Sequence, residues 1–265
     1  MIEPLVERAQ RGDAAALEEL LGQVAPSVRR FGMRMCRNPA DADDALQDTL
    51  LGIATHLGEF AGRSSFTSWV FTLTRTACAR RRRGMKNRPA ESDDQLALHA
   101  DVAAGPEERV SDGELAEALG TALASLSEEH SEVIHLRDVE GLTAAEAADA
   151  LGITVDALKS RLHRARAAMR DALQPLLEPR AMPRREGCPD VVSLWSRKLE
   201  GELDAKVCAD IEAHIAVCPS CGSACSSLRR ALGACRSAGQ EPVDAALQER
   251  IRGAVKSILA RNLIS

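Results

Sequence analysis

The chain has 265 residues, more than one small module requires, so two or three domains are expected. Hydrophobic residues make up 45% of it and aromatic residues only 2%, so its cores must be built from Ala, Leu, Val and Ile, as in packed helices. We therefore predict an all-α protein. The net charge of −5 indicates no particular partner. There is neither an apolar run of roughly eighteen residues nor a signal peptide, so we expect a cytoplasmic chain without membrane segments.

Three helices are predicted in the N-terminal part of the chain. The first covers residues 14–35, and the second follows Asn38-Pro39. This second helix has an apolar stripe and, beside it, an acidic face at helical spacing, formed by Asp44, Gln47 and Asp48. An acidic face next to a core face favours docking on a basic protein partner, with plain solvation as the alternative.

The third helix is preceded by a loop and is capped by Ser64 or Ser65. Its first half is apolar and includes Trp69, and it continues into an arginine run. Such a helix is suited to holding single-stranded DNA against a positive wall, which makes Trp69, Arg80 and Arg81 candidate DNA-binding residues. The alternatives are core packing for Trp69 and a solvated helix end for the arginines.

Charge is unevenly distributed along the chain. Residues 75–88 and 159–170 are basic, whereas residues 91–117 are strongly acidic. Two basic segments joined by an acidic one predict two contacts on a polyanion. Pro89, just before the acidic segment, and Gly105 and Pro106 within it indicate a flexible linker. We divide the chain into a first domain (1–88), an acidic linker (89–112), a second domain (113–175), a third domain (187–239) and a C-terminal segment (240–265).

A helix-turn-helix pattern lies in the second domain. A helix over residues 127–140 is followed by Thr143-Ala-Ala-Glu146, a capping box that starts a short, Ala-rich helix. Gly152 then makes the turn, and Thr154 caps a longer helix that ends near residue 173.

The longer helix has two faces. One is an apolar stripe with steps of three and four residues, which can be buried against the preceding helices. The neighbouring face carries only cationic or hydrogen-bonding side chains, as a recognition helix needs for contacts with base edges and phosphates. A solvated basic helix in a bundle is the alternative. The stripe consists of Leu158, Leu162, Ala165 and Met169, and the polar face of Lys159, Ser160, His163 and Arg164.

Most of the 8 cysteines lie in the last third of the chain, a density that in an intracellular protein favours metal binding or redox sensing over structural disulfides. His214 and Cys218 are one helical turn apart, and the two-residue gap to Cys221 lets two thiolates reach one ion. We predict one zinc ion, with Cys188 as the fourth ligand; absence of any metal is the alternative. Cys208 and Cys225 compete for the fourth position.

The remaining thiols give two further expectations. The extra cysteines of the last third leave copper or cadmium open as a sensed metal. Cys36 and Cys78 are isolated in the sequence, so we expect them to be small core residues. A final amphipathic helix over residues 243–263 either clasps the N-terminal domains or covers the core of its own domain; its apolar side consists of Leu247, Ile251, Val255, Ile258 and Leu259.

Taken in this order, the motifs resemble a sigma factor of the sigma-70 family, in the extracytoplasmic-function group that keeps only regions 2 and 4. The resemblance covers about residues 14–173 and implies a chain that binds RNA polymerase core, through the β′ clamp helices and the β flap, and promoter DNA, and that is not an enzyme. The segments that carry it are Asn38–Asp48, Phe66–Trp69, Gly141–Glu146 and Lys159–Arg166.

The resemblance also implies roles for single residues. The acidic face of Asp44, Gln47 and Asp48 would contact the β′ clamp helices, and the helix of Trp69 would capture and melt the −10 element. The polar face formed by Lys159, Ser160, His163 and Arg164 would read the −35 element. The chain departs from the family at Thr76 and Arg80, where relatives carry Asn and an acid, so no −10 sequence preference is implied.

Residues 187–235 resemble a zinc-containing anti-sigma domain, on the upstream Cys, the His-x-x-x-Cys-x-x-Cys pattern and Leu199–Leu203. In that family the domain binds its sigma factor and blocks polymerase. The resemblance implies an intramolecular sigma/anti-sigma contact, which oxidation of Cys218 and Cys221 with loss of metal would release.

Two other functions remain as alternatives. One is a helix-turn-helix, metal-sensing regulator that binds duplex DNA as a dimer. The other is a thiol oxidoreductase that uses Cys218 and Cys221, which is disfavoured because no strand pattern surrounds this motif.

Overall fold

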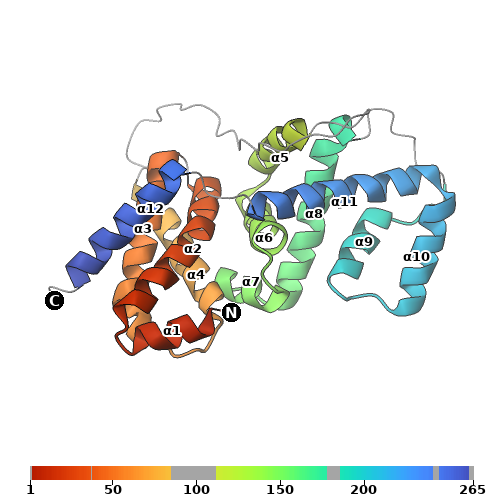
Figure 1. The fold of residues 1–265 in the computed structure, drawn as a ribbon. Helices are drawn as coiled ribbons and strands as arrows, with labels where there is room; N and C mark the ends of the chain where they lie inside the picture. Colours follow the sequence, from red (N-terminus) through yellow and green to blue (C-terminus); the bar gives the residue numbers. More distant parts are fainter. Residues whose placement is uncertain (1, 37, 85–111, 178–185, 241–244, 263–265) are drawn as a thin grey trace. The chain divides into compact units, whose positions relative to one another are not determined.

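The computed structural model describes residues 2–36, 38–84, 112–177, 186–240 and 245–262. Within these ranges every regular element is a helix or helical turn, which confirms the predicted all-α class (Figure 1). None of the described helices has the length and the apolar composition needed to cross a membrane. The predicted acidic linker, apart from its last residue, lies outside the described residues.

The described residues form two compact units. The first unit contains four N-terminal helices, a short 3-10 turn and the C-terminal helix, together with residues 149–152. Its elements are α1 (Glu3–Gln10), α2 (Ala14–Met35), α3 (Pro39–His56), η1 (Leu57–Glu59), α4 (Phe66–Gly84) and α12 (Ala245–Asn262). The prediction was right for α2, α3 and α4 and missed α1.

Polar caps start the helices of the first unit. The side chain of Asp13 accepts a hydrogen bond from the Ala16 backbone N–H at the start of α2, and that of Asn38 accepts one from Asp41 at the start of α3. At α4 the cap is Ser65, whose hydroxyl accepts from the backbone N–H of Ser68 at 3.1 Å. Each cap satisfies a donor that the first helical turn leaves without a partner.

The core of the first unit includes the C-terminal helix. Ile251, Val255 and Ile258 of α12 are buried in the same cluster as Leu50 and Ile53 of α3. The final helix therefore packs on α2 and α3, which is the first of the two alternatives that the sequence left open. The side chain of Leu247, also predicted on this apolar side, lies outside the described residues.

The second unit contains most of the remaining helices. The helix predicted over residues 127–140 is in fact α6 followed by the π-helical turn η3. The predicted recognition helix, α8, continues through Pro175 to Leu177, and Leu173 and Leu177 are buried. The elements are α5 (Asp112–Ser125), α6 (Glu128–Ile134), η3 (His135–Val139), α7 (Ala144–Leu151), α8 (Val155–Leu177), α9 (Val191–Leu199), α10 (Ala205–Val217) and α11 (Pro219–Gln240).

The helix-turn-helix caps form as predicted. Glu146 accepts a hydrogen bond from the backbone N–H of Thr143, and the Thr143 hydroxyl accepts one from the Glu146 backbone N–H, which is the reciprocal capping box. Gly152 has φ 66°, the left-handed conformation that ends α7 cheaply only for glycine. Thr154 then caps α8 through the N–H of Ala157.

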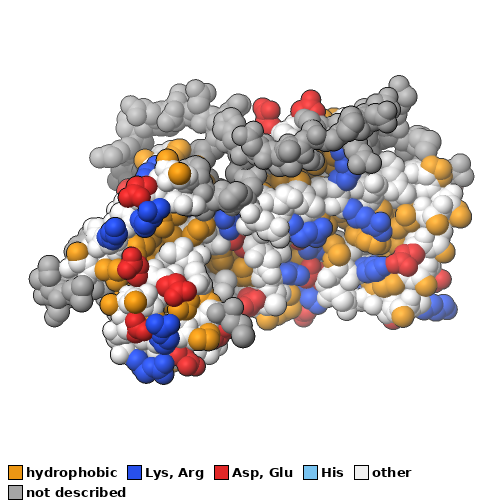
Figure 2. Space-filling view, in the orientation of Figure 1, with side chains coloured by type: hydrophobic (Ala, Val, Ile, Leu, Met, Phe, Trp, Pro, Cys, Tyr) orange, Lys and Arg blue, Asp and Glu red, His pale blue; other side chains and the backbone are white. Residues whose placement is uncertain are grey.

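The apolar stripe of α8 is fully buried, as predicted. The helices α5, α6 and α11 pack against α8. The helices α9–α11 and the residues before them, 186–240 in total, are here called the Cys/His domain. This domain packs on α8, and α11 runs across that helix (Figure 1). The sulfur of Cys235 in α11 lies 3.6 Å from the sulfur of Met169. On the visible surface, acidic and basic side chains are interspersed rather than gathered into one patch of a single sign (Figure 2).

Candidate metal centre and DNA-reading helix

Four side chains that can ligate a metal come together in the Cys/His domain. Cys188, His214, Cys218 and Cys221 offer ligand atoms that all lie within 4.8 Å of one another. These are the four residues named from the sequence. The competitor Cys225 is not part of this cluster, and its thiol faces the carbonyl oxygen of Val191 instead.

The chain turns sharply to bring these ligands together. Asp204 caps α10, and His214 lies in its last turn. The sequence spacing predicted that Cys218 lies inside this helix, but it lies directly after it. Its N–H still donates to the His214 carbonyl oxygen at 2.9 Å. Pro219 then starts α11, so that Cys221 lies in the first turn of the next helix.

A glycine makes the close approach of these two helices possible. A Cβ atom added at Gly222 would lie 3.0 Å from the backbone carbonyl oxygen of Ile215 in α10. A larger residue at this position would require the Ile215 carbonyl group to shift by a few tenths of an ångström.

The chemistry of the four residues fits zinc. Three thiols and one imidazole form a Cys3His set, which zinc accepts in tetrahedral geometry. Nε2 of His214 is buried and, among the described residues, has no hydrogen-bond partner. A buried ring nitrogen without a partner is costly, and a metal ligand bond would satisfy it.

The thiols of this cluster differ in proton affinity. A hydrogen bond from the backbone N–H of Cys221 lowers the pKa of the Cys218 thiol below its ordinary value. Burial, followed by the neighbouring thiols of Cys188 and Cys218, raises the pKa of Cys221 to about 12. Because a metal binds the thiolate, ligation of Cys221 must displace its proton.

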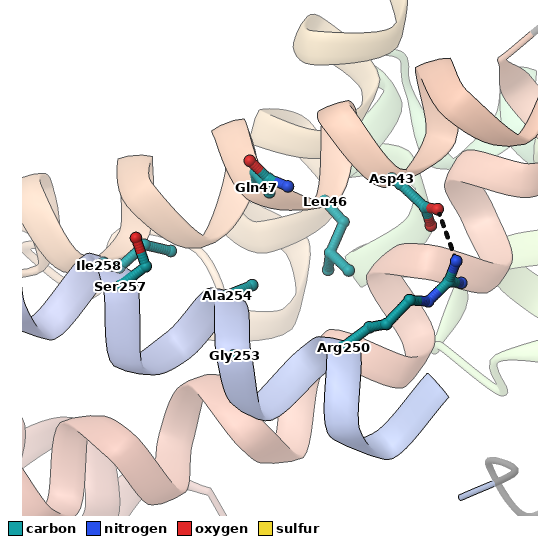
Figure 3. A pocket seen from close by; sticks show the side chains of 8 residues that line it. All are labelled: Asp43, Leu46, Gln47, Arg250, Gly253, Ala254, Ser257 and Ile258. Carbon is teal, nitrogen blue, oxygen red and sulfur yellow. Dashed lines mark ion pairs between the residues drawn. The ribbon is translucent and has the colours of Figure 1, made fainter. Parts of the chain in front are cut away.

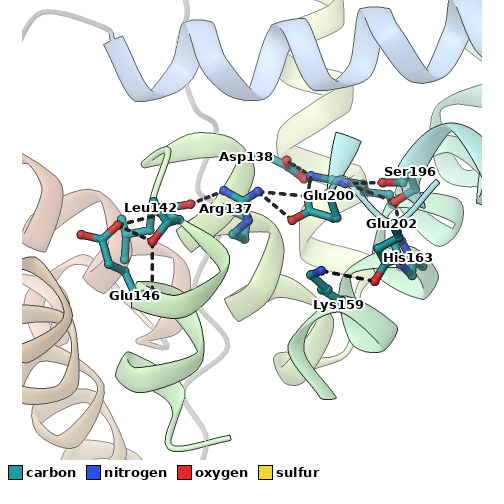
Figure 4. A network of polar contacts seen from close by, with 11 residues as sticks. Arg137, Asp138, Leu142, Glu146, Lys159, His163, Ser196, Glu200 and Glu202 are labelled. Carbon is teal, nitrogen blue, oxygen red and sulfur yellow. Dashed lines mark hydrogen bonds and ion pairs between the residues drawn. The ribbon is translucent and has the colours of Figure 1, made fainter. Parts of the chain in front are cut away.

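The predicted DNA-reading face of α8 is only half open. Ser160 and Arg164 are exposed. Lys159 and His163 instead meet the Cys/His domain: Nζ of Lys159 is 3.6 Å from a carboxylate oxygen of Glu202, and Nε2 of His163 is 2.8 Å from the other oxygen (Figure 4). Nδ1 of His163 lies 2.8 Å from the hydroxyl of Ser196.

A buried ion network lies beside this contact. Arg166 of α8 donates to Asp138 of η3 at 2.6 and 2.9 Å and to Glu200 of the Cys/His domain at 2.9 Å. Arg137 of η3 donates to both oxygens of Glu200 (Figure 4). The Glu200 side chain is 1% exposed and that of Arg166 is 3% exposed. Each buried charge therefore needs the opposite charge of the other, and of their neighbours, to offset the cost of its desolvation.

The charges of this network shift its pKa values. Burial alone would lower the pKa of Arg166, but the hydrogen bond and charge of Asp138 outweigh burial and raise it. Burial would likewise raise the pKa of Glu200, but the hydrogen bond from Arg137 and the charge of Arg166 lower it below its usual range. Arg166 and Glu200 are therefore both charged near neutral pH.

The turn between α9 and α10 aims both glutamates at α8. Gly201 has φ 68°, so the backbone reverses between Glu200 and Glu202. Sequence reasoning did not identify Arg166, Arg137 or Glu200 as functional residues. The one available signal was the pair of glutamates around a glycine within the segment Leu199–Leu203.

The acidic face of α3 is exposed but not free of contacts. Arg81 of α4 donates to Asp44 at 3.2 Å and to Asp48 at 2.6 Å. Of the residues predicted to hold single-stranded DNA, Arg81 is thus bound to the acidic face, whereas Arg80 is exposed. Trp69 is half-buried, and its ring centroid lies 5.2 Å from that of Phe60.

The C-terminal helix lies on the neighbouring side of α3. Arg250 of α12 forms an ion pair with Asp43 at 3.2 Å (Figure 3). Gln47 of the acidic face and Leu46 line a pocket of about 360 Å³ together with residues of α12, including Ala254 (Figure 3). The face of α3 that carries Gln47 is therefore bordered by the C-terminal helix.

Cys36 and Cys78 are buried in the core, as predicted. The packing of α4 against α2 also brings their two sulfur atoms to 2.6 Å, which was not predicted. Nothing in the sequence spacing of 42 residues indicates this contact.

Comparison with known proteins assigns the three parts of the chain. Residues 20–88 match the family model of Sigma-70 region 2, and residues 116–169 match that of Sigma-70, region 4. Residues 188–222 match a zinc-finger family model.

Two curated relatives match over most of their length. RNA polymerase sigma factor CarQ of Myxococcus xanthus is 33% identical over 172 residues, which are 64% of this chain and 97% of CarQ. ECF RNA polymerase sigma factor ShbA of Streptomyces griseus is 33% identical over 183 residues, which are 64% of this chain and 94% of ShbA.

Among solved structures, the chain is similar to the sigma factor RpoE in complex with the anti-sigma factor NepR from Bartonella quintana. The identity is 24%, the match covers 57% of this chain and 92% of the other, and the TM-score is 0.44. On the sequence matches, this chain belongs to the extracytoplasmic-function group of RNA polymerase sigma factors in the sigma-70 family, which are transcription factors and not enzymes.

Proposed function

We propose that this sigma factor directs RNA polymerase core to its promoters and that its own Cys/His domain holds it inactive until a signal releases it. The observation that carries the proposal is the contact of Glu200 and Glu202 with α8. An acidic turn occupies cationic and hydrogen-bonding side chains that a recognition helix uses on DNA.

In this function, three of the helical surfaces described above each bind polymerase or DNA. The acidic face of Asp44, Gln47 and Asp48 contacts the β′ clamp helices of polymerase. The helix of Trp69, with Arg80, holds the melted −10 strand, and the polar face of α8 reads the −35 element in the major groove. The second domain also contacts the β flap.

The contact with the Cys/His domain is incompatible with this use of α8 for two reasons. The major groove is about 12 Å wide and admits one α-helix, so a helix layer against Lys159 and His163 cannot enter with α8. The carboxylate of Glu202 also stands where phosphate and base acceptors would have to be, and two anions there repel each other.

The covalent connection makes a modest contact sufficient for inhibition. The second and third domains of the sequence division are joined by a linker of about ten to fifteen residues. Such a linker gives each domain an effective concentration on the order of millimolar at the other. A signal must then weaken the contact by several kcal/mol. Moving the ratio of released to inhibited chain from 1:99 to 99:1 takes about 5.5 kcal/mol.

The C-terminal helix supplies a second contact. α12 packs on α2 and α3 and pairs Arg250 with Asp43, next to Gln47 of the polymerase-binding face. A polymerase helix that approaches this side of α3 would meet α12. We therefore include α12 in the inhibitory apparatus.

The metal centre holds the inhibitory turn in position. Zinc would be bound by Cys188, His214, Cys218 and Cys221, and its binding energy would stabilise the fold of the Cys/His domain. Oxidation of Cys218 and Cys221, or removal of the metal, would loosen the domain that carries Glu200 and Glu202. We propose this as the route of release.

Run-off transcription with purified core polymerase and a library of promoter fragments from the source genome tests the proposal. The full chain is compared with Glu200→Gln/Glu202→Gln, which removes the two charges of the turn. Promoter-specific transcripts should rise about tenfold or more in the double variant, because tenfold corresponds to only about 1.4 kcal/mol. The matched control is Glu212→Gln, an exposed carboxylate that pairs with Lys198 of its own domain.

Each outcome decides a part of the proposal. If no variant gives transcripts above core polymerase alone, the sigma role fails. If all three proteins transcribe equally, the sigma role stands and inhibition by the turn fails. Lower activity of the double variant would make the domain an activator. Dimeric binding to duplex DNA without polymerase would favour the helix-turn-helix regulator.

A further inference from the structure

Two thiols face each other inside the first unit. Cys36 is the residue directly after α2, and Cys78 lies within α4. Their sulfur atoms are 2.6 Å apart, and the residues are 9% and 0% exposed. Both are free cysteines, and neither belongs to the metal-ligand cluster.

The surroundings of the pair fix both helices. Arg82, one turn beyond Cys78 in α4, donates to the backbone carbonyl oxygen of Met35 at 2.9 Å. Arg81 binds Asp44 and Asp48 of α3. The contact of Arg82 therefore holds α4 next to the end of α2, and that of Arg81 holds α4 on α3. The two sulfur atoms are placed next to each other by these contacts in the folded protein.

The environment divides the roles of the two thiols. The hydrogen bond between the two thiols lowers the pKa of Cys36, whereas the same hydrogen bond, together with burial, raises the pKa of Cys78. Cys36 is also the one with some access to solvent. The thiolate is the reactive form, so Cys36 is the thiol that a small oxidant meets first.

We propose that Cys36 and Cys78 are a peroxide-sensitive disulfide site that cross-links α2 to α4. The Cys36 thiolate attacks one oxygen of hydrogen peroxide, the O–O bond breaks, and hydroxide leaves with Cys36 oxidised to a sulfenic acid. The hydroxide takes up the proton that Cys36 lost and becomes water. The Cys78 sulfur then attacks the Cys36 sulfur, the S–O bond breaks, and the oxygen leaves as a second water with the proton of the Cys78 thiol. In total two thiols and one peroxide give one disulfide and two waters.

The geometry permits this product with little movement. A disulfide has its sulfur atoms about 2.05 Å apart, so the two atoms need to approach by only about half an ångström from their present separation. Peroxide is small enough to reach a thiol at the edge of a core. The inference concerns the first unit alone and does not depend on inhibition by the Cys/His domain.

Peptide mapping of the full chain tests the inference. The zinc-loaded protein is treated with hydrogen peroxide, remaining thiols are alkylated, and the chain is digested with trypsin without reduction. The linked peptides Met35–Arg37 and Thr76–Arg80 should appear, with loss of both alkylated peptides, and dithiothreitol should restore them. Cleavage after the flanking arginines makes this pair easy to identify.

The control is Cys36→Ser, in which the linked peptide must vanish while Cys78 remains alkylatable. Because the mapping is done first on the unaltered chain, a folding defect in the variant does not affect the answer. Two results overturn the inference. One is equal alkylation of Cys36 before and after peroxide; the other is linkage of Cys36 to a cysteine of the Cys/His domain.

Discussion

Nε2 of His163, on α8, lies 2.8 Å from a carboxylate oxygen of Glu202. The second ring nitrogen lies 2.8 Å from Ser196. Both hydrogen-bonding positions of the imidazole are thus engaged by the chain's own Cys/His domain. If α8 binds DNA as proposed, DNA and this domain compete for these two atoms.

Replacing Glu200 should destabilise the second unit. In Glu200→Ala, Arg137 and Arg166 lose a buried carboxylate, and we expect a loss of about 3 kcal/mol in the free energy of unfolding, near the lower end for a broken buried pair because Arg166 keeps Asp138. Urea unfolding can be followed through Trp195 fluorescence in a Trp69→Phe background. Glu212→Ala should change the free energy by less than about 1 kcal/mol. Equal effects would show that burial of Glu200 has no energetic consequence.

Stability from Glu200 should depend on pH in one direction. Its pKa in the folded chain is lowered from the usual 4.5, so its contribution is complete above 4.5 and is lost as the pH falls through the folded-state value. The difference in unfolding free energy between the unaltered chain and Glu200→Gln should be constant from pH 7 to pH 5 and shrink in more acid solution. The paired comparison cancels the acid sensitivity of the metal ligands. A difference that grows on acidification would contradict the assignment.

Metal content should follow the four-residue cluster. We expect about one equivalent of zinc in the purified chain, and a loss of most of it in His214→Ala and in Cys218→Ser, because each removes one of four ligands. Elemental analysis by mass spectrometry measures this directly. Cys208→Ser is the control and should keep its zinc. Unchanged zinc in both ligand variants would refute the site.

Removal of the metal should also release α8 from its contact with the Cys/His domain. A chelator that strips zinc should raise promoter-specific transcription of the unaltered chain, since the turn of Glu200 and Glu202 is then no longer supported. The same treatment should have little further effect on Glu200→Gln/Glu202→Gln. A drop in transcription on chelation would mean that the metal supports the sigma domains themselves.

Two glycines of α11 should respond oppositely to alanine. A Cβ atom at Gly239 would collide with the backbone carbonyl of Val139, so Gly239→Ala should destabilise the second unit by about 1–3 kcal/mol. Within the described part of the chain, no atom outside the helix's own backbone lies within 4 Å of a Cβ at Gly233, so Gly233→Ala should stabilise the helix by about 0.5–1 kcal/mol. Urea unfolding of the two variants tests the pair, and the same sign for both would exclude the close approach at Gly239.

Loosening the C-terminal helix should strengthen binding to core polymerase. Val255 is buried on the inner side of α12, and Val255→Asp should detach this helix from α2 and α3 and increase affinity for core in a pull-down titration. Lys256→Asp, which alters charge at an exposed neighbouring position, should leave affinity unchanged. Weaker binding of Val255→Asp would mean that α12 is a structural part of the polymerase-binding unit.

The sequence by itself determined the local features. Helix starts at Ser65, Thr143 and Thr154 follow from side chains that cap the nearest backbone donors, and the apolar stripe of α8 follows from helical periodicity. The metal cluster was also foreseeable, because three of its ligands lie within eight consecutive residues and only Cys188 had to be chosen among competitors.

Only the tertiary structure decided which distant residues meet. The partners Glu202 and His163 are 39 residues apart, and Cys36 and Cys78 are 42 apart, distances at which no periodicity carries information. The choice of α2 and α3 as the support of α12 likewise depends on which apolar face fits another, because burial of apolar area is non-directional and leaves the partner of an amphipathic helix open. Local rules therefore located α8 and its polar face, and packing decided that the Cys/His domain of the same chain covers part of that face.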